Sequence, residues 1–101
     1  MTTAWDRLMD LLDRSTAEGT DLGEDLLAEL AGLVALAQAD GTVDRELHPT
    51  ESARALLALL VGHRHVRGLP GAGADEDLAT LRLVVTRWLH PTRVGRARDS
   101  G

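Results

Sequence analysis

The sequence predicts an all-α protein of four helices. Four segments, at about residues 4–14, 24–39, 49–67 and 76–90, repeat apolar side chains at the three- and four-residue spacing of an amphipathic helix. Segments rich in Gly, Asp or Pro separate them, and no segment shows the apolar and polar alternation of a strand. With 101 residues, 44% of them hydrophobic and 27% charged, the chain has the size and composition of one globular domain. We therefore expect a single helical domain over residues 1–91.

Local signals mark the helix ends in order. Thr3 followed by Asp6 is typical of a capping box at the start of the first helix. Asp40-Gly41 is expected to end the second, since Gly suits the left-handed position just past a helix. Pro49 suits the first position of the third helix, and Pro91 disfavours helical backbone at the residue before it, so the fourth helix should end near His90.

The helix expected over 49–67 is apolar on two sides. Its main face contains Ala53, Leu56, Leu57, Leu60 and Val61, and its opposite face contains Ala55, Leu59, Gly62 and Val66. A helix with two apolar faces needs two structures to pack against, and in a chain this short we expect one of them to be another protomer. The predicted dimer interface comprises Ala55, Leu59, Gly62, Val66 and, on the fourth helix, Leu83. The fourth helix itself carries one apolar stripe: Leu78, Leu81, Val84, Val85, Trp88 and Leu89.

Charge is distributed unevenly and argues against direct nucleic-acid binding. Residues 1–51 carry twelve acids and three arginines (net −9), and residues 52–101 carry four acids and eight arginines (net +4), which together give the overall −5. The acidic half would repel phosphate. The third helix is too apolar to be the reading helix of a helix-turn-helix, and residues 92–101, with Arg93, Arg96 and Arg98, are expected to form a disordered basic tail.

No catalytic or metal-binding pattern is present, so we predict neither an enzyme nor a metal or cofactor. The absence of cysteine excludes disulfides and thiolate chemistry. The loop after Asp40 is not an EF-hand, since Gly41 at position six would place Leu36 and Leu47 where carboxylates are required. His63 and His65 would lie about 200° apart around a helix, too far to share a metal easily.

Nothing in the sequence predicts export or membrane insertion. Residues 1–4 are uncharged and are followed by acids rather than by an apolar run, unlike a signal peptide. The longest apolar run, residues 55–62, is far shorter than a membrane span. We expect a cytoplasmic protein that does not contact a membrane.

The stretch from Leu26 to Pro91 resembles the C-terminal half of TetR-type transcriptional repressors, particularly the BetI-like subgroup. The segments that carry the resemblance are Ala39-Asp40-Gly41, His48-Pro49-Thr50-Glu51, the run from Ala53 to Gly62, and the final Trp88-Leu89. They are apolar patterns more than individual side chains, and the stretch covers about two-thirds of the chain.

The resemblance implies an effector-binding and dimerisation domain whose last two helices pair with those of a second subunit as an intermolecular four-helix bundle. It also implies a small-molecule pocket, for which we name Trp5, Met9, Leu30, Leu33, His63 and Trp88. TetR-type repressors are about twice as long and carry an N-terminal DNA-binding domain with no counterpart here. A fragment, a truncated reading frame and a stand-alone module remain open, and a stand-alone module would form a homodimer or a heterodimer with a full-length relative.

Two alternatives belong to other functional classes. The sequence Ala39-Asp40-Gly41 followed by acids also resembles TerB-like tellurite-response domains, which would imply a metal-linked stress protein. The third possibility is a plain helical interaction protein without ligand or metal. Oligomeric state and ligand binding distinguish these hypotheses.

Overall fold

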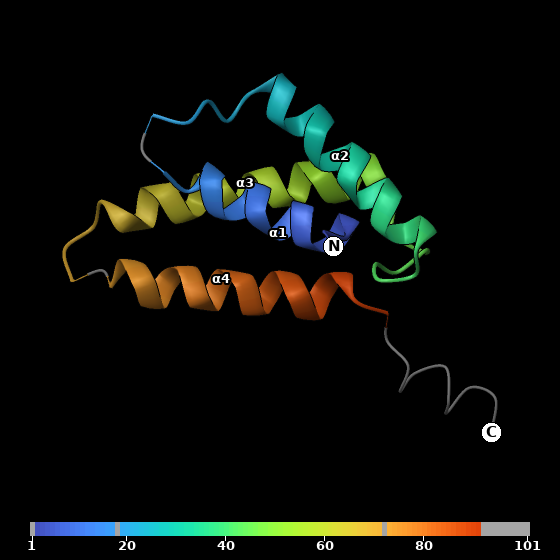
Figure 1. Ribbon diagram of the computed structural model, residues 1–101. Coiled ribbons are helices and arrows are strands. Elements are labelled where there is room, and N and C mark those ends of the chain that lie inside the picture. The colour runs from blue at the N-terminus through green and yellow to red at the C-terminus, as the bar shows by residue number, and fades with distance from the viewer. Residues whose placement is uncertain (1, 18, 72, 92–101) are drawn as a thin grey trace.

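Four helices form the described structure, and the all-α prediction is confirmed. The computed structural model describes residues 2–17, 19–71 and 73–91, and the predicted basic tail at 92–101 lies outside these residues. The helices are α1 (Ala4–Ser15), α2 (Glu24–Ala39), α3 (Pro49–Arg67) and α4 (Ala74–Leu89), and no strand occurs among the described residues. Each helix packs against the next one in the sequence: α1 contacts α2, α2 contacts α3, and α3 contacts α4. The helices α3 and α4 run antiparallel to each other (Figure 1).

The helix ends follow the predicted local signals. At α1 the Thr3 hydroxyl accepts a hydrogen bond from the Asp6 amide at 3.1 Å and the Asp6 carboxylate accepts one from the Thr3 amide at 3.3 Å, which completes the capping box. After α2, Gly41 has a φ of +87°, the left-handed conformation that Gly adopts without strain. Pro49 occupies the first turn of α3. The fourth helix begins at Ala74, two residues before the predicted start, because Gly73 serves as its N-cap.

The hydrophobic core lies where α1, α2 and α3 meet. Leu8 of α1, Leu30 and Val34 of α2, and Leu56 of α3 are fully buried in it. The fourth helix contributes mainly through its C-terminal half, where Val85 and Leu89 are fully buried. The core is therefore a three-helix core to which one end of α4 is added.

The end of α4 is held by the loop between α2 and α3. The Asp44 amide donates a hydrogen bond to the Leu89 carbonyl at 2.8 Å, and the His90 ring lies 2.7 Å from the Thr42 carbonyl oxygen. The His90 ring also packs on Trp5 of α1, with ring centroids 4.2 Å apart. These contacts place the C-terminal end of α4 beside the N-terminal end of α1.

Two arginines of α3, which we call the arginine clamp, bind the backbone that follows α1. The guanidinium of Arg64 donates to three carbonyl oxygens at 2.9 to 3.2 Å, and that of Arg67 donates to a fourth at 2.6 Å. The acceptors belong to Ser15, Ala17, Thr20 and, for Arg67, Thr16. Carbonyls at the C-terminal end of a helix have no partner within that helix, so the clamp satisfies them and attaches this end of α1 to α3.

We expect Leu30→Ala to lower the free energy of unfolding by about 3 kcal/mol, because it leaves a cavity in the fully buried core. Leu36→Ala is the matched control, since Leu36 lies on the same helix and is 51% exposed, and it should change stability by less than about 0.5 kcal/mol. Urea unfolding at one fixed protein concentration measures both. Equal losses would contradict the assignment of the two faces of α2.

We expect Arg64→Lys to cost about 1 to 2 kcal/mol, because an ammonium cannot reach three carbonyls in the planar geometry of the guanidinium. The control is Arg54→Lys on the exposed side of the same helix, which should be nearly neutral. Hydrogen exchange at the C-terminal turn of α1 should rise in the Arg64 variant alone. Unchanged exchange there would show that the clamp does not hold this segment.

Candidate functional site

A shallow groove runs between α3 and α4 on the outside of the domain. One hollow encloses about 380 Å³, and a second of about 360 Å³ continues it toward the C-terminal end of α4. The two share Ala58, Leu59 and Val84, so they form one feature, which we call the α3–α4 groove. Its lining residues are Ala55, Ala58, Leu59, Gly62, His63 and Val66 of α3, and Asp77, Thr80, Leu81, Val84 and Trp88 of α4.

The helical repeat explains how the sequence builds this groove. On α3 the lining side chains recur at intervals of three or four residues from Ala55 to Val66, and on α4 they recur in the same way from Asp77 to Trp88. Small residues at positions 55, 58 and 62 keep the α3 wall low. A Cβ at Gly62 would meet no neighbouring atom within 4 Å among the described residues, so the wall is open at this point.

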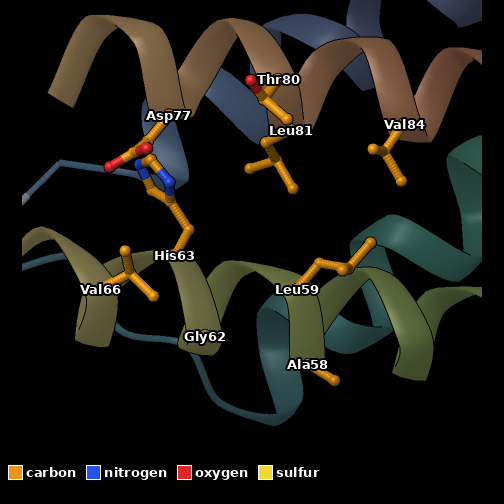
Figure 2. Close-up of a pocket in the computed structure, with 9 residues that line it drawn as sticks. All are labelled: Ala58, Leu59, Gly62, His63, Val66, Asp77, Thr80, Leu81 and Val84. Atoms are coloured by element: carbon orange, nitrogen blue, oxygen red, sulfur yellow. The ribbon is translucent and has the colours of Figure 1, made fainter. Parts of the chain in front are cut away.

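The groove is apolar along most of its length and polar at one end. Leu59, Leu81 and Val84 project into it from the two helices, and His63 and Asp77 lie together near the N-terminal end of α4 (Figure 2). Asp77 is the only acidic residue that lines it, and no Arg side chain does so. Such a surface can hold an apolar group along its length and a polar group at this end.

Most of the predicted dimer interface lies in this groove. Ala55, Leu59, Gly62 and Val66 form its α3 wall, as expected for the second apolar face of that helix. Leu83 does not line the groove but is 50% exposed on α4, next to Val84 in the sequence. The structure thus places four of the five residues on one continuous surface and leaves the fifth exposed beside it.

The residues predicted for a ligand pocket are divided between two places. Met9, Leu30 and Leu33 are buried in the core, and Trp5 packs against His90 at the other end of α1 from the clamp. His63 and Trp88 both line the α3–α4 groove, each in a different hollow. Of the six, only His63 and Trp88 therefore line the groove, and the other four belong to the core or pack against it.

Two parts of the predicted apolar faces differ from expectation. The stripe on α4 is not buried as one face, because Val85 and Leu89 are fully buried, Leu78, Leu81 and Trp88 are partly buried, and Val84 is 48% exposed. On α3, Val61 was assigned to the main core face and is instead 51% exposed. In both helices the core covers a narrower sector than the apolar pattern: on α4 the fully buried residues lie in the C-terminal half, and on α3 the fully buried apolar residues are Ala53, Leu56 and Leu60.

Asp77 and Thr80 are groove residues that the sequence analysis missed. Asp77 reads as one of three acids in the first turn of α4, where carboxylates favour the helix dipole. The available signal was its spacing, since residues 77, 81, 84 and 88 share one side of the helix. This spacing indicates a groove only when α3 is known to form the opposite wall.

The acidic loop after α2 uses its carboxylates locally. Asp40 accepts hydrogen bonds from the amide and the hydroxyl of Thr42, at 3.0 and 2.7 Å, and Asp44 accepts one from the Glu46 amide at 3.0 Å. These are turn contacts of the kind Asp makes after a helix. Over residues 2–17, 19–71 and 73–91 no three His, Asp or Glu side chains gather where they could hold a metal ion.

Neither a membrane span nor a known relative provides a further indication of function. None of the described helices is long and apolar enough to cross a bilayer. Comparisons with protein-family models, curated proteins and solved structures found no match to this chain.

We expect Gly62→Ala to raise the stability of the isolated domain by about 0.5 to 1 kcal/mol, because Ala is the better helix former and the groove has room for its methyl group. Gly32→Ala in α2 is the matched control, since its Cβ would also meet nothing within 4 Å. Thermal unfolding in dilute protein should show the same gain for both. A loss at Gly62 alone would contradict the open α3 wall.

Proposed function

We propose that this chain is the dimerisation and ligand-sensing domain of a TetR-type transcription regulator, and that it pairs with a second copy through the α3–α4 groove. The observation that carries the proposal is that the outer face shared by α3 and α4 is apolar and is not covered by any part of the chain that the structure describes. Val66, Leu83 and Val84 on this face are each 42 to 50% exposed. Large exposed apolar surfaces on small domains usually mark sites of association.

The shape of this face suits a symmetric helical dimer. Two antiparallel helices presented side by side can pack on the same two helices of a second copy, which gives a four-helix bundle with twofold symmetry. From Ala55 to Gly62, α3 contains no charged residue, and His63 follows at the polar end of the groove. An interface centred on Leu59 and Val84 would therefore bury little charge.

The regulatory part of the proposal rests on the family resemblance from Leu26 to Pro91. In a TetR-type regulator this domain would hold two DNA-binding domains together, and a small-molecule effector would alter the pairing. The domain would act as a homodimer or by pairing with a full-length relative in the cytoplasm. The apolar character of α3 supports its role as a packing helix rather than a reading helix.

Leu59→Glu and Leu83→Glu test the proposed interface. We expect each to raise the dimer dissociation constant roughly 100-fold or more, because a carboxylate would be buried without a partner. Leu36→Glu is the control: Leu36 is as exposed as Leu83 but lies on α2, and its replacement should leave self-association unchanged. Sedimentation equilibrium over micromolar concentrations measures the constants, and circular dichroism checks helix content.

Three results would contradict the proposal. The wild-type chain would remain monomeric throughout the micromolar range, or all three Glu variants would associate equally, or Leu36→Glu alone would dissociate the dimer. Collapse of the helical signal in Leu59→Glu would place Leu59 in the core of the protomer, and Leu83→Glu would then carry the test alone.

A further inference from the structure

The polar end of the α3–α4 groove brings together a buried side chain of α3 and a half-buried side chain of α4. His63 of α3 and Asp77 of α4 point toward each other across it (Figure 2). His63 is 8% exposed, although Val61, Gly62, His65 and Val66 of the same helix are exposed. The Oδ2 atom of Asp77 is inaccessible to water.

Neither group has a hydrogen-bond partner in the part of the chain that the structure describes. Asp77 Oδ2 accepts no hydrogen bond there, and the His63 ring takes part in none of the side-chain hydrogen bonds found among these residues. A buried carboxylate oxygen without a partner is destabilising, since it has lost its water and gained nothing in return. This end of the groove is therefore ready to receive a hydrogen-bond donor.

The arginines closest in sequence to these two groups are engaged elsewhere. Arg64 and Arg67 bind carbonyl oxygens after α1 through the arginine clamp. Arg82 of α4 pairs with Asp13 of α1 at 2.9 Å. The negative charge of Asp77 is thus not neutralised by these side chains.

The missing partner is best supplied by a cation that carries an apolar group. An ammonium has three donors and no acceptor, so it can donate both to Asp77 and to an unprotonated nitrogen of His63. Next to this end, Leu59, Leu81 and Val84 offer an apolar surface. The hollow of about 380 Å³ falls within the range of small-molecule sites.

We propose that the His63–Asp77 end of the α3–α4 groove binds a small amphipathic amine, with its ammonium on Asp77 and its apolar body on Leu59, Leu81 and Val84. This amine is then the effector class of the ligand-sensing domain. An anion would be repelled by Asp77, and a neutral donor would gain only an uncharged hydrogen bond.

The amine also regulates pairing, and this part rests on the proposed dimer. A second copy that packs on Leu59 and Val84 covers the same surface as the amine, so the two exclude each other. A ligand that binds only the free protomer shifts the equilibrium toward that protomer. At ten times its own dissociation constant, the amine should raise the dimer dissociation constant about 100-fold, since both protomers must release it before they pair.

The test uses the full chain with 2-phenylethylammonium, and with 2-phenylethanol and phenylacetate as its neutral and anionic counterparts. Isothermal titration calorimetry should show that the ammonium binds at least about tenfold more tightly than the alcohol, and that phenylacetate does not bind. Asp77→Asn should lose that tenfold preference. The matched control is Asp75→Asn, which removes the same charge from the same turn of α4 at an exposed residue outside the groove, and it should keep the preference.

Equal affinity for the ammonium and the alcohol would overturn the ligand site, and so would equal losses in Asp77→Asn and Asp75→Asn. Circular dichroism on both variants shows whether α4 is intact. If Asp77→Asn unfolds, Thr80→Val and Leu81→Ala in the same groove replace it, and unchanged ammonium binding in both would also overturn the site.

Sedimentation equilibrium with and without 2-phenylethylammonium separates this proposal from the dimer. A wild-type dimer that the ammonium dissociates, and that the alcohol leaves intact, supports both. A dimer that never responds, in a chain that binds no ammonium, overturns the ligand site alone. A chain that is always monomeric yet binds the ammonium through Asp77 overturns the dimer and the competition, and supports the ligand site.

Discussion

The arginine clamp is the interaction on which the rest of the structure depends. A guanidinium group on α3 binds three backbone carbonyls after α1, and a second one nearby binds a fourth. This fixes the end of α1 on α3 and thereby the point from which the chain turns toward α2. Carbonyls at the end of a helix have to be satisfied by some donor, and here the donors come from residues 44 to 51 positions away along the chain.

The clamp also shapes the chemistry of the opposite side of α3. Arg64 follows His63 directly, but its side chain reaches toward α1 while His63 faces α4. An arginine used to hold backbone on one side of a helix cannot neutralise a carboxylate on the other. The Oδ2 atom of Asp77 has no hydrogen-bond partner among the described residues, and the proposed amine site depends on Arg64 being engaged on the other side of α3.

The C-terminal half of α4 is packed into the core, whereas its N-terminal half contributes no fully buried side chain among the described residues. Val85, Leu89 and the contacts of His90 fix its C-terminal half, whereas its N-terminal half faces α3 across the groove. A helix held in this way can present an apolar edge to a second copy or to a small molecule without disturbing the core. The two proposals therefore concern one surface and two occupants, and the balance between them is the regulatory property that we propose.

The sequence alone determined the four helices, the capping box of α1, the end of α2 and the two-sided apolar character of α3, because each depends on residues within a few positions of one another. Thr3 with Asp6, Gly41 and Pro49 act over a single turn, and a helical repeat needs no knowledge of its neighbours. What the sequence could not decide is which side of each apolar helix is covered. Val61 and Val84 read as core residues and lie exposed, and Asp77 read as a helix-end acid and lies in a groove, since burial depends on where a distant helix packs. Only the tertiary structure, by engaging Arg64 on one side of α3 and placing α4 on the other, decided that the Asp77 carboxylate and the buried His63 imidazole would line one groove.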